Sequence, residues 1–272
     1  MGLFKRNKDA KKQSQQSNPV SGVTAIFEVH MNMALSFYEE KNYGAAFDLF
    51  KLVAENTDNS KAQYNLGSLY AQGLGTEQEF IEAAYWFNRA YKNGEEGADK
   101  LTTKCLLDYA NVVLRTKTPK EVYESLSAFS KRVYNTENCS VIVRKNLLEL
   151  GTYYFNTKKD YAMAAKLFRA GAEYENDGWC QNYLAVLYNA GAGVEKNDLA
   201  SLYWFDKASE QGVDAAKTDR DGMLNAYINN LGKLETAEQL RLLAGWCTNG
   251  TEEAVPIDEV KAVYWKNMIA AL

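Results

Sequence analysis

The stretch AQYNLGSLYAQGLGTEQEFIEAAYWFNRAYKNGEEGA, residues 62–98, contains two helical patterns separated by a glycine turn. Apolar side chains recur at intervals of three and four residues up to a Gly-x-Gly turn at residues 73–75, and the spacing resumes from Phe80 to Gly94. This spacing predicts two helices, because positions i, i+3, i+4 and i+7 share one helix face. Glycine favours the left-handed conformation that ends a helix. The segment is therefore predicted to fold as a helix hairpin.

A second copy of this pattern lies further along the chain. Residues 37–118 align without gaps onto residues 155–236 at a constant offset of 118. Roughly 25 of about 80 aligned positions are identical, against about five expected from composition. The identical pairs include Tyr43 and Tyr161, Phe50 and Phe168, Leu66 and Leu184, Gly73 and Gly191, Gly75 and Gly193, Trp86 and Trp204. A short hairpin cannot bury its apolar faces alone, so successive hairpins must stack and share one core.

Three segments of the chain resemble Sel1-like repeats. Residues 62–98 carry the Leu-Gly-x-Leu-Tyr helix, the paired-glycine turn and the aromatic pair of that family, and residues 180–216 are similar, with a Gly-Val turn at Gly193-Val194. Residues 240–272 resemble a degenerate third copy with a longer turn that contains Pro256. The hairpins near 25–58 and 142–176 are closer to tetratricopeptide units.

The resemblance implies an all-α fold, a right-handed α-α superhelix or solenoid of stacked Sel1-like and tetratricopeptide-like hairpins. We expect this solenoid to occupy residues 23–272. Residues 1–22 are basic and polar, with almost no apolar side chains, and are expected to form a disordered leader. Residues 98–140 and 213–240 are predicted to be helical from their spacing but carry no recognisable motif.

Charge and cysteine usage point to a cytoplasmic protein that does not bind nucleic acid. The net charge is −4, and the basic residues of the leader leave the rest of the chain at about −8. An acidic body lacks the positive surface that a phosphate backbone requires. The four cysteines lie far apart, as expected of reduced thiols, and neither a secretory signal nor a bilayer-spanning stretch is present.

The residue types that carry catalysis or bind metals do not form a recognisable set. His30 is the single histidine, so an imidazole metal site or a cysteine–histidine pair has no second member. The glycine turns lack the third glycine of a dinucleotide loop and the Gly-Lys-Ser/Thr of a phosphate loop. We predict no catalytic residue, no cofactor and no metal. Trp86 and Trp204 are expected to pack between helices.

A binding groove is implied by the family resemblance, because the first helix of each stacked hairpin lines the concave face of such folds. Positions that differ between the two copies, while the apolar positions agree, are the expected groove residues: Lys61, Tyr64, Ser68, Trp179, Asn182 and Val186.

The predicted function is therefore a non-catalytic, cytoplasmic adaptor or regulatory scaffold that binds a protein or peptide. One alternative is an accessory subunit of an enzyme or of a membrane-associated complex. A hydrolase of the cysteine-rich Sel1-like type is the other, but the cysteine pair that those proteins carry in every repeat is missing here. Weak contact of the basic leader with an anionic membrane is a separate alternative to plain disorder, and the sequence leaves the oligomeric state open.

Overall fold

A computed structural model of the chain describes residues 19–136, 138–251 and 254–272. Most of the predicted leader, residues 1–18, lies outside the described residues. The first helix begins at Pro19, so residues 19–22 are helical, which differs from the expected boundary of the solenoid at residue 23. Proline suits the first turn of a helix, because its fixed φ is helical and its missing N–H has no partner there.

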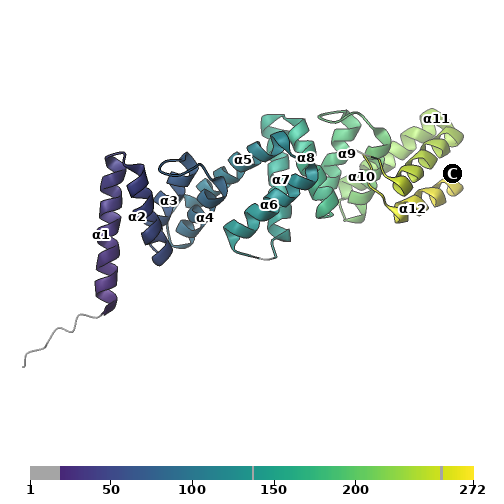
Figure 1. Ribbon diagram of the computed structural model, residues 1–272. Helices are drawn as coiled ribbons and strands as arrows, with labels where there is room; N and C mark the ends of the chain where they lie inside the picture. Colours follow the sequence, from purple (N-terminus) through teal and green to yellow (C-terminus); the bar gives the residue numbers. More distant parts are fainter. Residues whose placement is uncertain (1–18, 137, 252–253) are drawn as a thin grey trace, which may run out of the picture.

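The described residues form a single elongated row of helices and contain no β-strand. Helix α1 lies at one end of the row and α11 and α12 lie at the other (Figure 1). The helices are α1 (Pro19–Glu39), α2 (Tyr43–Asn56), α3 (Ser60–Gln72), α4 (Phe80–Lys92), α5 (Ala98–Thr116), α6 (Pro119–Tyr134), α7 (Ser140–Thr152), α8 (Tyr161–Tyr174), α9 (Gly178–Ala190), α10 (Asp198–Glu210), α11 (Asp214–Asn249) and α12 (Glu259–Ala271). A π-helical turn, η1 (Tyr153–Lys158), extends α7.

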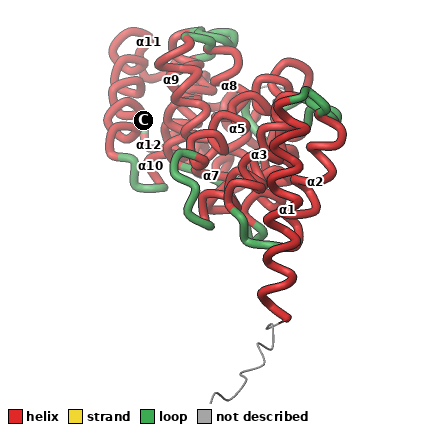
Figure 2. The backbone as a smooth tube through the Cα atoms, turned by 90° about the vertical axis from the view of Figure 1, so that its left-hand side faces the viewer, coloured by secondary structure: helices red, strands yellow, loops and turns green. Residues whose placement is uncertain are grey.

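Consecutive helices pack as hairpins, and each hairpin packs on the next. Figure 2 looks along the row from the end that holds α1, and the first turns of α1 project beyond the rest of the row. Helix α11 is two helical segments that meet at Gly232, whose φ of 79° and ψ of 168° are not helical. The all-α solenoid predicted from the repeats is confirmed.

The Gly-x-Gly turns reverse the chain within the two best-conserved hairpins of the duplication. Gly73 and Gly191 adopt the left-handed conformation at the ends of α3 and α9, with φ of 67° and 64°. Two residues later, Gly75 and Gly193 also have positive φ, and each lies directly against the backbone at the start of α2 or α8. A side chain at either position would collide with that backbone. These glycines therefore fix both the turn and the distance to the preceding hairpin.

Two groups of buried side chains form the core, and α4 belongs to both. Trp86 belongs to the group with side chains of α1, α2 and α3, whereas Phe87, which also contacts Tyr64 of α3, belongs to the group with the helices that follow. Trp86 and Trp204 are both buried, and the indole Nε1 of Trp204 donates to the carbonyl oxygen of Ala254 at 2.9 Å. The expectation that these tryptophans pack between helices is confirmed.

Ion pairs connect α11 and α12, the helices of the last hairpin, to α10. The carboxylate of Asp206 accepts hydrogen bonds from Lys261 of α12 and from Arg220 of α11, the latter at 2.8 Å. Lys261 also donates to Glu210 at 2.7 Å. Residue 88, which corresponds to Asp206 in the first copy, is an asparagine that donates to the Val133 carbonyl at 2.8 Å. An unpaired buried carboxylate is costly, so this ion-pair network specifies how the last hairpin docks.

The close approach of Gly193 to α8 predicts a large difference between two glycine-to-alanine variants. Gly193→Ala and Gly212→Ala both place a Cβ at positive φ, 71° and 81°, at a cost of about 1–2 kcal/mol. Only the first would also collide with the backbone of Tyr161 and Ala162, whereas the space around Gly212 is open. We expect Gly193→Ala to lower the free energy of unfolding by ~1–3 kcal/mol more than Gly212→Ala does. Urea unfolding followed by circular dichroism measures both, and equal losses would contradict the collision.

Candidate functional site

Two of the six predicted groove residues are exposed at corresponding places in the two copies. Lys61 lies in the first turn of α3, and Trp179 lies in the first turn of α9. The Trp179 side chain is 52% exposed, whereas Trp86, Trp204 and Trp265 are buried. These two residues are accessible to a partner.

The other four predicted groove residues lie deeper. The ring of Tyr64 makes an edge contact with Phe87, with 5.5 Å between centroids, and Ser68 donates to the Tyr64 carbonyl at 3.0 Å. Val186 packs against the core, and Asn182 is only 8% exposed. This differs from the expectation for Asn182, because α9 contacts both α8 and α10, which cover most of its circumference.

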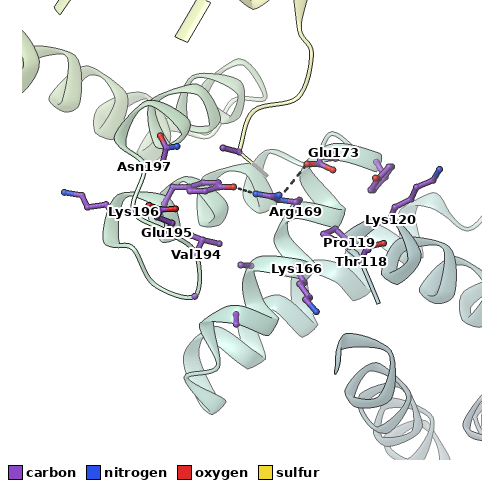
Figure 3. A pocket seen from close by; sticks show the side chains of 16 residues that line it. Thr118, Pro119, Lys120, Lys166, Arg169, Glu173, Val194, Glu195, Lys196 and Asn197 are labelled. Atoms are coloured by element: carbon purple, nitrogen blue, oxygen red, sulfur yellow. Dashed lines mark hydrogen bonds and ion pairs between the residues drawn. The ribbon is translucent and has the colours of Figure 1, made fainter. Parts of the chain in front are cut away.

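A hollow that was not predicted from the sequence runs along α8. We call it the α8 hollow; its volume is about 860 Å³. It is bounded by the first turn of α6, one face of α8, the end of α9, the turn before α10 and one residue before α12 (Figure 3). Its lining residues are Thr118, Pro119, Lys120, Ala162, Ala165, Lys166, Arg169, Glu173, Tyr174, Tyr188, Gly193, Val194, Glu195, Lys196, Asn197 and Ala254.

Two cations inside the α8 hollow are held by the protein itself. Lys166 donates to the Leu114 carbonyl at 2.8 Å, which places its charge at the carboxyl end of α5, where a cation is stabilised by the helix dipole. Arg169 forms an ion pair with Glu173 at 3.9 Å and a hydrogen bond with the Tyr188 hydroxyl. These contacts make the floor of the hollow rigid.

Two further cations lie at its edges. Lys120 follows the Thr118 cap of α6, and Lys196 precedes α10, where it lies 3.5 Å from Asp198. Both lysines are exposed, and Figure 3 shows them on opposite sides of Arg169. The hollow thus has a cation on each side. Its lining contains four cationic side chains and two acidic ones, Glu173 and Glu195.

The corresponding surface of the first copy has the opposite charge. Among the aligned positions, the second copy carries three cations and two anions, a net charge of +1: Lys166, Arg169, Lys196, Glu173 and Glu195. The first copy carries one cation and four anions, a net charge of −3: Lys51, Asp48, Glu55, Glu77 and Glu79. The helices of the two copies agree, so the charge difference belongs to the surface and not to the scaffold.

The cysteine thiols are shielded from solvent in the described structure. All four cysteines are buried and free, and burial raises the pKa of Cys105 and of Cys247 to about 12. Burial also raises the pKa of Cys180. Within the described residues, no group of three histidine, cysteine or acidic side chains could hold a metal ion. The ring of His30 makes an edge contact with the ring of Phe27, with 6.3 Å between the ring centroids.

A model of the Sel1 repeat family matches residues 60–95, 147–173, 180–213 and 240–270. The first, third and fourth matches fall on the segments that resemble Sel1-like repeats in sequence. The match at 147–173 falls on a hairpin that we had compared with tetratricopeptide units. Its turn contains η1 and a left-handed Lys159 in place of paired glycines, which hides the motif.

Two of the solved structures that are similar to this chain are repeat proteins of this kind. One is the crystal structure of c5321, a protective antigen of uropathogenic Escherichia coli strains with an SLR fold, at 20% identity, a TM-score of 0.31 and 92% coverage of this chain. The chain spans 55% of the length of that antigen. The other is a Sel1 repeat protein from Oxalobacter formigenes, at 19% identity, a TM-score of 0.27 and coverage of 93% and 88% of the two chains. No curated protein matches the sequence.

None of the helices in the described ranges has both the length and the apolar character needed to cross a membrane.

The burial of the cysteines predicts slow thiol modification of the folded protein. At pH 8 the thiols of Cys105, Cys180 and Cys247 are protonated, because pH 8 lies below their raised pKa, and the thiolate is the reactive form. Unfolding restores an ordinary pKa of about 8.5 and exposes the sulfurs. We expect Ellman's reagent to label all four cysteines rapidly in guanidinium and at least about tenfold more slowly without it. Rapid labelling of the folded protein would contradict this burial.

Proposed function

Because this chain is a Sel1-repeat protein, with that repeat at four positions, we propose that it is a non-catalytic scaffold that binds an acidic segment of another protein in the α8 hollow. Sel1 repeats generally mediate protein–protein interactions. The acidic character of the partner is our inference from the lining of the hollow. We also propose that the protein acts in the cytoplasm.

The observation that carries the proposal is a positively lined hollow in an otherwise acidic chain. Lys120 and Lys196 stand at its edges, Arg169 lies between them, and the equivalent surface of the first copy is acidic. A negatively charged peptide is attracted to the first surface and repelled by the second. The same scaffold therefore offers one favourable and one unfavourable site for the same ligand.

The dimensions of the hollow fit an extended peptide. The lining residues span α8 from Ala162 to Tyr174, a distance of about 20 Å at the rise of an α-helix. An extended chain covers that distance in about six residues. Tyr174 stacks on Tyr123 of α6 with 5.1 Å between centroids, so an aromatic platform lies at one end of the hollow. We expect the best ligands to combine acidic residues with one apolar side chain.

The predicted groove residues contribute a second contact in this proposal. Trp179 is exposed and tryptophan is enriched at the energetic centres of interfaces. Lys61 is its counterpart on α3. We propose that these two residues extend the partner-binding surface, whereas Tyr64, Ser68, Asn182 and Val186 support the helices.

If the protein is an accessory subunit of an enzyme, we propose that it binds the enzyme through the same α8 hollow. In that case, the chemistry resides in the bound partner, and this chain positions it. The suppressed thiols of the buried cysteines and the single histidine favour this division of labour over an activity of the chain itself.

The test measures binding of fluorescent peptides of equal length whose composition runs from acidic to basic. We expect the acidic peptides to bind best and to bind more weakly as salt is added, because exposed charges are screened. Lys120→Glu with Lys196→Glu should weaken their binding by about tenfold or more.

The control changes the net charge equally at a distance from the hollow. Lys100→Glu with Lys104→Glu alters two exposed lysines of α5 that do not line it. Equal losses for the two double variants would show a general charge effect, and preference for basic peptides would refute the proposal.

A further inference from the structure

Helix α1 presents apolar side chains on a face that no described residue covers. Ile26, Val29 and Met33 are 55%, 56% and 45% exposed. They follow one another at intervals of three and four residues, so they lie on one side of the helix. The opposite side packs on α2 through the buried Ala34 and Met31.

The residues of α3 and α7 that correspond to Val29 and Met33 of α1 are buried. Each such helix has a small residue opposite a phenylalanine of its partner helix: Gly67 lies against Phe87, and Gly151 lies against Phe168. Ala34, fully buried, holds the same place in α1. When Ala34, Gly67 and Gly151 are aligned, Met33 of α1 corresponds to Leu66 of α3 and Leu150 of α7. Val29 of α1 corresponds to Ala62 of α3 and Asn146 of α7. These four residues of α3 and α7 are buried, whereas Met33 and Val29 are exposed.

The preceding hairpin explains this burial. Helix α3 contacts α2 as well as α4, and α7 contacts α6 as well as α8. The exposed stripe of α1 therefore lies where a preceding hairpin would pack. Its side chains have the apolar character of an interior contact, although terminal repeats ordinarily carry a polar outer face. Residues 5–18 contain Ala10 as their one apolar residue, so their composition does not match the apolar stripe.

At the other end of the row, α12 also exposes apolar side chains. Val260 and Val263 of α12 are 78% and 56% exposed. Helices α10 and α12 correspond at an offset of 61, since each begins after a capping residue, Asn197 or Asp258, and each carries a Tyr-Trp pair.

At this offset, Val260 and Val263 match Leu199 and Leu202 of α10, which are buried. Helix α10 packs on α11, the next helix along the row. The surface of α12 therefore matches the surface with which α10 receives a following hairpin.

We propose that the partner of α1 is a second copy of this chain, with α1 of one molecule packed on α12 of the next. The contact would repeat between molecules the packing of α2 on α3 and of α8 on α9 within one molecule. Charge favours this head-to-tail arrangement over a pairing of α1 with α1. Helix α1 contains Glu28 and Glu39 but no lysine or arginine, whereas α12 carries both Lys266 and Glu259 within one turn of Val263. Pairing α1 with another α1 would bring acidic helices together without a lysine or arginine from either helix.

Head-to-tail contacts of this kind do not close, so they produce open rows whose length rises with protein concentration. A single contact between helix ends is at the small end of the range of protein interfaces. We therefore expect weak association, with dissociation constants in the micromolar range or above.

Sedimentation velocity of the full chain over a range of concentrations tests the proposal. The average mass of the unchanged protein should rise with concentration. Val29→Glu with Met33→Glu blocks one end, and Val260→Glu with Val263→Glu blocks the other, each because two carboxylates would be buried without partners. Either double variant alone should associate at least about a hundredfold more weakly. An equal mixture of the two variants should form dimers that grow no further.

Val141→Glu is the matched control, because Val141 is an exposed valine of the interior helix α7 and should leave association unchanged. Circular dichroism checks that all variants remain folded.

Three outcomes would overturn the proposal. One is an unchanged protein that stays monomeric at every concentration. Another is dimerisation of the Val260/Val263 variant by itself, which would indicate α1 paired with α1. The third is binding to vesicles of anionic phospholipid that is lost with the Val29/Met33 variant, because the stripe would then be a membrane contact.

Discussion

The contact between a glycine on the first helix of a hairpin and a phenylalanine on the second sets how closely the helices of two hairpins, α3–α4 and α7–α8, approach each other. A Cβ added at Gly67 would come to 3.0 Å from the Phe87 ring, and at Gly151 it would collide with Phe168. The two helices can approach this closely only because the side chain is missing. Close helices leave no room for an independent core, so each hairpin buries its remaining apolar surface against its neighbours.

This dependence on neighbours separates the scaffold from its surfaces. Apolar positions that face the next hairpin are nearly the same in both copies, since they must fill the same space. Positions outside that contact are free to differ, and the sign of the charge changes between the two equivalent surfaces along α2 and α8. A repeated scaffold thus carries two different surfaces, and at the one along α8 the first turn of α6 forms part of the wall of a hollow.

The two ends of the row follow from the same constraint. The buried Asp206 and Lys261, together with the partly buried Arg220, fix the last hairpin by charge pairing, which is directional and tolerates few alternatives. On α12 of that hairpin and on α1 of the first one, apolar side chains of the kind that serve stacking are exposed. An interior type of contact is then available between molecules.

The sequence by itself determined the helices, their glycine turns and the order of the hairpins, because periodicity and turn chemistry are local properties of the chain. It also identified Trp86 and Trp204 as core residues from their place in the repeat. Only the tertiary structure decided how much of each helix is covered. Asn182 fits a groove by its position in α9 yet is buried, because two flanking helices cover it. Lys120, Arg169 and Lys196 form one surface although they are far apart in sequence, because stacking brings three hairpins together. Coverage and proximity depend on which neighbours pack where, and no local pattern contains that information.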